Sequence, residues 1–238
     1  MKLHPFALVC ALSLLAPLNG CGMTRVLGLK DEGGVGGLTA VGASTLSLPL
    51  EFDSVVYSLN DASESYWMSD VSLDEIAAGK VENGVLAHVQ LLWRPYPGKT
   101  PTGASALNLA VRVLVISNGE MGLYSGGGFG DPSGDVGSDL VELVVMGSSV
   151  TLVAKSAGFV DLLSPGALLV DVAARLSPDE AVRYRRAAAQ LITNKLQEPR
   201  WVRRDDADGP LDIASAFFGP STGITTTPSI QTVPLGTY

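Results

Sequence analysis

The sequence predicts an α+β fold: a mostly antiparallel β-sheet with one short helix and one long amphipathic C-terminal helix. Two observations lead to this prediction. Segments with alternating apolar residues recur through the middle of the 238-residue chain, and short turns join them. Helix signals occur in only two segments, which is too few for the crossover connections that a parallel sheet requires.

Six or more strands are expected between residues 52 and 176. The clearest covers 85–94, where apolar residues from Val85 to Trp93 occupy every second position. Asn118–Gly119 has the composition of a tight turn between two antiparallel strands. The expected strands are 52–59, 85–94, 107–116, 121–124, 140–146, 150–155 and 167–176.

Both helices carry start signals. Ser72 and Glu75 have the spacing of a capping box, and Gly79 ends this short helix. The long helix would start at the N-cap Ser177, with Pro178 in its first position and Glu180 completing a second capping box, and would run to about Leu196. Its expected apolar stripe is Ala181, Tyr184, Ala188, Leu191 and Ile192.

Composition divides the rest of the chain. Residues 21–48 are rich in glycine, serine and threonine and are expected to form a flexible tether. Residues 49–204 would form a single globular α+β domain. Residues 205–238, rich in proline and threonine, would form a disordered or loosely attached tail.

The first 21 residues have the pattern of an export signal. A basic start at Lys2 precedes an apolar run over 6–15, and Leu18, Gly20 and Cys21 follow it. The run is too short to cross a bilayer, which needs about 20 apolar residues. This pattern resembles the lipobox of bacterial lipoproteins. The resemblance implies that a signal peptide, residues 1–20, is removed and that the Cys21 sulfur carries a diacylglycerol.

The same resemblance implies a lipid-anchored location in a bacterial cell envelope, on the periplasmic or outer-membrane side, with the membrane as a partner. An ordinary secretory signal followed by a chance cysteine is the alternative. Cys10 would leave with the signal peptide, and lipid would occupy Cys21. The mature chain would then have no disulfide, cysteine nucleophile or cysteine metal site.

The net charge of −8 disfavours nucleic acid as a partner. Residues 175–204 are an exception, with a net charge of +5. Exposed arginines there, including Arg183 and Arg186, could form a face for an envelope protein partner. The simpler alternative is a solvated helix face whose charges pair with the acidic remainder.

Two groups of residues are candidate sites. His88 and Arg94 would share one strand face, with Arg112 on a neighbouring strand, and could bind a ligand; the alternative is the solvated face of a half-buried sheet. Residues 126–138 read as a loop rich in glycine and aspartate. Its carboxylates are weak candidates for calcium ligands, and the alternative is a solvent-exposed loop whose glycines adopt positive φ. These carboxylates are Asp131, Asp135 and Asp139.

The catalytic equipment is sparse, so no cofactor or metal is expected. Residues 219–223 match the Gly-x-Ser-x-Gly pattern of hydrolases, but no histidine follows Ser221. The leading hypothesis is a non-enzymatic, lipid-anchored envelope protein that serves as an accessory or assembly component. The alternatives are a binding module for a small ligand or anionic polymer, and a hydrolase that uses Asp or Glu.

Overall fold

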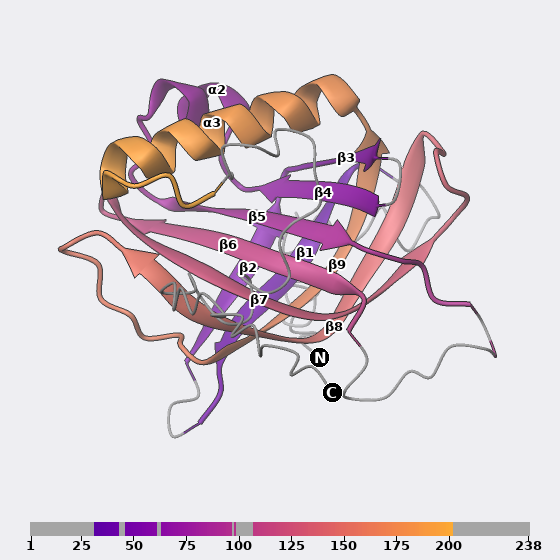
Figure 1. Ribbon diagram of the computed structural model, residues 1–238, viewed down its shortest axis with the longest axis horizontal. Coiled ribbons are helices and arrows are strands. Elements are labelled where there is room, and N and C mark those ends of the chain that lie inside the picture. The colour runs from indigo at the N-terminus through magenta and orange to yellow at the C-terminus, as the bar shows by residue number, and fades with distance from the viewer. Residues whose placement is uncertain (1–30, 43–45, 61–62, 97, 99–106, 202–238) are drawn as a thin grey trace, which may run out of the picture. The chain divides into compact units, whose positions relative to one another are not determined.

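The computed structural model describes residues 31–42, 46–60, 63–96, 98 and 107–201 (Figure 1). Its elements all belong to one compact unit that begins at Glu32. The strands are β1 (Gly33–Ala40), β2 (Ser47–Phe52), β3 (Ser54–Asn60), β4 (Ser63–Ser69), β5 (Gly84–Leu91), β6 (Leu109–Ser117), β7 (Glu120–Ser133), β8 (Leu140–Lys155) and β9 (Gly166–Leu176). The helices are α2 (Leu73–Ala78) and α3 (Pro178–Leu196).

The nine strands form one sheet in the order β2-β1-β9-β3-β4-β5-β6-β7-β8. Because β8 pairs with β9 as well as with β7, the sheet closes on itself. Every pairing is antiparallel except the short parallel contact between β3 and β9. The prediction of a mostly antiparallel sheet with two helices, one of them long and C-terminal, is therefore confirmed.

Closure gives the sheet a buried inner face. Alternate residues of each strand point into the enclosed space, which tyrosines and branched aliphatic residues fill, among them Tyr57, Tyr66 and Tyr124. The remaining positions point outward. Over β3 to β6 this outer face is covered by α3 (Figure 1), which forms a second core with Trp67 and Leu114.

The helices follow their sequence signals in part. The capping box of Ser72 and Glu75 is present, and Gly79 ends α2. The predicted apolar stripe of α3 is buried in full. The second capping box is wrong, since Ser177 makes no side-chain cap hydrogen bond. The Ser177 N–H instead donates to the carbonyl of Tyr57, and the Glu180 carboxylate pairs with Arg175. Neither α2 nor α3 has the length and hydrophobicity to cross a membrane, and the described residues include no other helix.

The predicted tether is wrong at residues 33–40 and 47–48, which belong to strands β1 and β2. Residues 33–40 are β1, which lies between β9 and β2 and buries Leu38 completely. Its glycines serve close packing: a Cβ on Gly34 would lie 2.4 Å from the carbonyl oxygen of Asp171, and one on Gly36 would lie 2.5 Å from that of Leu169. The folded part thus begins well before residue 49. The predicted segments 1–20 and 205–238, and residues 21–30, lie outside the described residues.

The predicted glycine-rich loop is wrong over residues 126–133, which continue β7, and a loop is present only over residues 134–139. Gly126 and Gly128 have no positive φ. They face β8 so closely that a Cβ on Gly126 would lie 1.8 Å from the Ser149 carbonyl oxygen. The two strands predicted at 140–146 and 150–155 are one strand, β8, with a register shift around Gly147, whose φ is +64°. A bulge of this kind lets a long strand bend.

We expect Gly126→Ala to lower the free energy of unfolding by about 2–4 kcal/mol, because the new methyl group would overlap the backbone of β8. Urea denaturation measures this effect. Gly37→Ala is the matched control, since its Cβ would meet nothing closer than 3.8 Å in the same sheet. Equal stability of the two variants would contradict the close-approach explanation.

Candidate functional site

The five residues predicted to form a ligand or partner face lie in three separate places. His88 and Arg112 are paired neighbours on β5 and β6, as expected. Arg94 lies apart from them: β5 ends at Leu91, so the strand alternation does not carry His88 and Arg94 onto one face. Arg183 and Arg186 lie on the exposed side of α3.

The surroundings of His88 are aromatic and closed. Its ring stacks on Trp67 with a centroid distance of 4.2 Å, and Nε2 shares a hydrogen bond of 2.7 Å with the Ser65 hydroxyl. Trp201, just beyond α3, completes the enclosure at 6.1 Å from the His88 ring. The Arg112 guanidinium donates to the Trp201 carbonyl and lies 5.9 Å from its ring centroid. The solvated face expected at His88 is therefore wrong, because the segment after α3 folds back over it.

Burial, together with the positive charges of Arg112 and Arg185, lowers the pKa of His88 to about 3. Nδ1 is buried without a hydrogen-bond partner in the described part of the chain. The ring is therefore neutral near pH 7 and packs as an aromatic group between two tryptophans. This arrangement connects the sheet to the end of α3.

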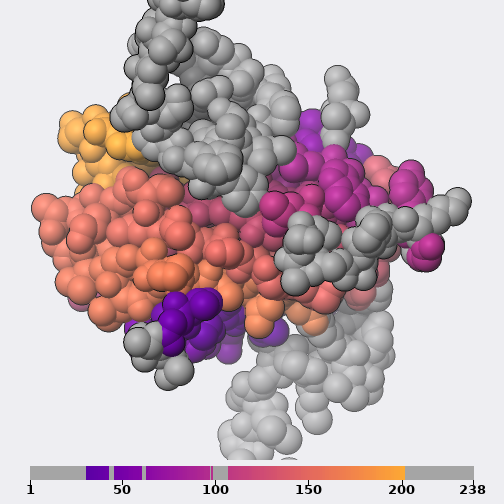
Figure 2. Space-filling model, turned by 60° about the horizontal axis from the view of Figure 1, so that its bottom comes forward, coloured from indigo at the N-terminus to yellow at the C-terminus, as the bar shows by residue number. Residues whose placement is uncertain are grey.

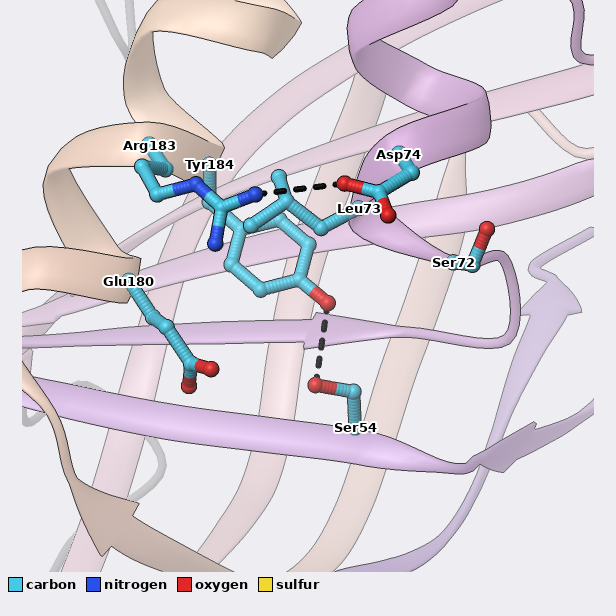
Figure 3. A pocket seen from close by; sticks show the side chains of 7 residues that line it. All are labelled: Ser54, Ser72, Leu73, Asp74, Glu180, Arg183 and Tyr184. Carbon is cyan, nitrogen blue, oxygen red and sulfur yellow. Dashed lines mark hydrogen bonds and ion pairs between the residues drawn. The ribbon is translucent and has the colours of Figure 1, made fainter.

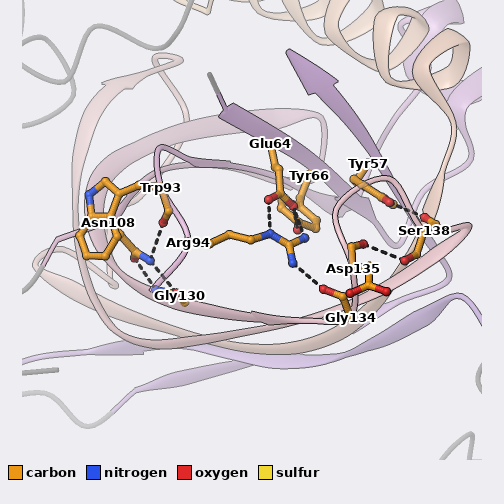
Figure 4. Close-up of polar contacts among 10 residues, drawn as sticks. All are labelled: Tyr57, Glu64, Tyr66, Trp93, Arg94, Asn108, Gly130, Gly134, Asp135 and Ser138. Atoms are coloured by element: carbon orange, nitrogen blue, oxygen red, sulfur yellow. Dashed lines mark hydrogen bonds and ion pairs between the residues drawn. The ribbon is translucent and has the colours of Figure 1, made fainter. Parts of the chain in front are cut away.

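A second polar cluster closes one end of the sheet (Figure 4). Arg94 binds the Glu64 carboxylate through two nitrogens, at 2.5 and 2.9 Å, and donates to the Gly134 carbonyl at 2.6 Å. The Tyr66 hydroxyl donates to the same carboxylate at 2.6 Å. Burial and the hydrogen bond to Glu64 raise the pKa of Tyr66, so the phenol keeps its proton. The cluster joins β4, the segment after β5 and the loop after β7.

The carboxylates predicted as weak metal ligands do not converge. Asp131 is in β7, opposite Val144. Asp135 and Asp139 lie in the short loop before β8 and accept hydrogen bonds through their backbone carbonyls, from Ser138 and Leu176 respectively. The Tyr57 hydroxyl fixes the same loop by donating to the Ser138 carbonyl. Within the ranges that the structure describes, no group of three or more His, Cys, Asp or Glu residues could hold a metal ion.

A shallow groove of about 320 Å³ lies between α2 and α3 (Figure 3). Its polar side chains are paired across it: Arg183 bonds Asp74 at 3.2 Å, and the Tyr184 hydroxyl donates to the Ser54 hydroxyl at 2.9 Å. Sequence reasoning missed this groove, because only the packing of α2 beside α3 creates it. The lining residues are Ser54, Ser72, Leu73, Asp74, Glu180, Arg183 and Tyr184.

The basic stretch 175–204 is largely paired with carboxylates of the same unit. Arg175 binds Glu32 and Glu180, and Lys195 lies 3.6 Å from Glu120. Arg183 and Arg200 also have acidic partners. This pairing favours the simpler alternative of a solvated helix face. Arg203 and Arg204 lie outside the described residues.

Cys21, the predicted lipidation site, also lies outside the described residues. No protein family model, curated protein or solved structure matches this chain. The function must therefore be inferred from the residues themselves.

We expect the pH dependence of stability to report the buried neutral ring of His88. Its pKa is lower in the folded state, so below about pH 6.5 the unfolded chain binds a proton that the folded chain does not. As the pH decreases from 6.5 to 3, this group should lower the free energy of unfolding by up to about 1.4 kcal/mol per pH unit. When urea denaturation is repeated over this pH range, the free energy of unfolding of His88→Phe should depend on pH less steeply by that amount. His88 is the only histidine after residue 20, so an unchanged slope would contradict this account.

Arg94→Met should lower the free energy of unfolding by about 3 kcal/mol, because it leaves the nearly buried Glu64 carboxylate without its cation. Adding Glu64→Gln should restore part of the loss, since no uncompensated charge then remains. Urea denaturation of the single and double variants measures the coupling. Strictly additive effects would show that the pair does not act as a unit.

Proposed function

We propose that this chain is an exported lipoprotein of a bacterial cell envelope, anchored by lipid at Cys21. Its closed-sheet domain would act as a non-enzymatic accessory or assembly component on the periplasmic or outer-membrane side. The observation that carries the proposal is the order of residues at the N-terminus: a basic start, the apolar run 6–15, then Leu18, Gly20 and Cys21.

The interactions of the polar residues support a role without chemistry. Arg94 and Tyr66 bind the Glu64 carboxylate, and the His88 ring is neutral and enclosed. These groups stabilise the closed sheet and its contact with α3. Tight pairing of this kind suits a rigid body that other envelope components could dock against.

The position of β1 places the proposed anchor close to the folded domain. Only residues 22–32 separate Cys21 from Gly33, instead of the 27 residues of the predicted tether. Eleven residues reach at most about 36–40 Å when fully extended. The domain would therefore remain within one molecular diameter of the membrane that holds the lipid.

We expect the chain expressed in a bacterium to incorporate a palmitate analogue and to sediment with membranes. Cys21→Ser should abolish both, because the acylated sulfur is lost. Cys10→Ser is the matched control: it changes the only other cysteine, inside the apolar run, and should leave labelling intact. Label on Cys21→Ser, or a mature protein whose Cys21 thiol is unmodified by mass spectrometry, would overturn the proposal.

A further inference from the structure

We propose that one end of the closed sheet, where β1 ends, β2 begins and a loop joins β8 to β9, rests on the lipid surface. We call it the apolar end and define it by Val41, Leu46, Val160 and Leu162. This inference rests on the proposed lipid anchor, and it adds the orientation of the domain: which of its surfaces touches the bilayer.

The two segments of the apolar end are adjacent. The Val41 N–H donates to the carbonyl of Pro165 at 2.7 Å, and the Ala40 N–H closes the hairpin on the Leu46 carbonyl at 2.8 Å. The four defining side chains are exposed although they are large and apolar: 56% for Val41, 45% for Leu46, 69% for Val160 and 60% for Leu162.

The β8–β9 loop does not need these exposed side chains in order to fold. Phe159 and Leu163 are buried in the interior core, and Lys155 donates to the Phe159 carbonyl. Val160 and Leu162 lie between these two buried residues in the sequence and face outward. Large apolar side chains held in water by a well-anchored loop are typical of a contact surface.

The single carboxylate of this loop is directed inward. Asp161 accepts hydrogen bonds from the Tyr124 hydroxyl at 2.8 Å and from the N–H groups of Leu163 and Ser164, both at 3.1 Å. Its charge is therefore satisfied within the fold. The apolar end can approach lipid headgroups without stripping water from an unpaired charge.

Two other surfaces also expose apolar residues, and their charges distinguish them. At the opposite end, Trp93 and Tyr96 are exposed, but the neighbouring loop carries Asp135 and Asp139. Anionic lipid would repel those carboxylates.

The outer face of β1, β9 and β8 is the second rival surface, and Figure 2 shows parts of these strands at the surface, in indigo, orange and salmon. It exposes Val35, Val144 and Leu169, but the register places exposed Asp171 between Val35 and Val144. The exposed Asp171 therefore interrupts this row of apolar side chains.

The length of chain before β1 permits this orientation. β1 starts at Gly33, and its eight residues carry the chain about 26 Å to the hairpin at the apolar end. Asp31 and Glu32 lie at the opposite end of β1, where Glu32 binds Arg175, and they add about 7 Å to that span. The chain from Cys21 to Asp31 reaches about 33–36 Å when fully extended, which just covers the total of about 33 Å. Lipid at Cys21 and the apolar end can therefore meet the same bilayer.

The test places a probe at the apolar end of a chain whose anchor does not depend on lipidation. The chain from residue 21 with Cys21→Ser carries an N-terminal hexahistidine tag, bound to nickel-chelating lipid in vesicles of phosphatidylcholine and phosphatidylglycerol. Cys10 and Cys21 are then both absent, so Val160→Cys supplies the only thiol for an environment-sensitive dye. Leu169→Cys and Val136→Cys are the controls, since these positions are comparably exposed at 53% and 62%.

We expect at least a twofold rise in dye fluorescence at residue 160 on binding to vesicles, quenched by nitroxide-labelled lipid, with less than a 1.2-fold change at residues 136 and 169. No rise at residue 160, or an equal rise at either control position, would overturn the proposal. A Cys21 thiol found unmodified in cells would instead contradict the proposed lipid anchor, independently of the dye measurement.

Discussion

The pairing of β8 with both β7 and β9 is the constraint on which the rest of the structure depends. It closes the strands from β9 through β3 to β8 into a ring, to which β1 and β2 are attached at β9, and it encloses the larger hydrophobic core. The pairing requires β7 and β8 to approach more closely than side chains permit, which is why Gly126 and Gly128 face Ser148 and Ser149. The bulge at Gly147 supplies the bend that directs β8 from one neighbour to the other.

Closure also determines what the polar residues can do. An open antiparallel sheet would leave every second side chain of β5 in water. Here the interior and α3 bury both faces, so His88 is held neutral between aromatic rings and Glu64 is compensated by Arg94. Buried polar groups must find partners inside the protein. Their interactions explain how the fold is stabilised.

The N-terminal segment and the folded domain therefore contribute different parts of the proposed function. The order of residues up to Cys21 is the basis for the proposed lipid anchor. The domain, with its short connection at Gly33, determines how it can stand relative to the membrane. The Asp161 carboxylate in the loop at the apolar end is hydrogen-bonded within the fold. This loop therefore presents no unpaired carboxylate to the membrane that the proposed anchor would hold nearby.

The sequence by itself determined the antiparallel strands, the Asn118–Gly119 turn, the α2 capping box and the buried stripe of α3. These features depend on local periodicity and backbone preference, which neighbouring residues reveal. Only the tertiary structure decided that residues 33–40 are a strand, that Arg94 leaves the face of His88, and that α2 and α3 form a groove. Each depends on contacts between segments distant in sequence. Glycine illustrates the limit: the same residue type permits a flexible loop or a close approach between strands, and only the partner strand distinguishes them.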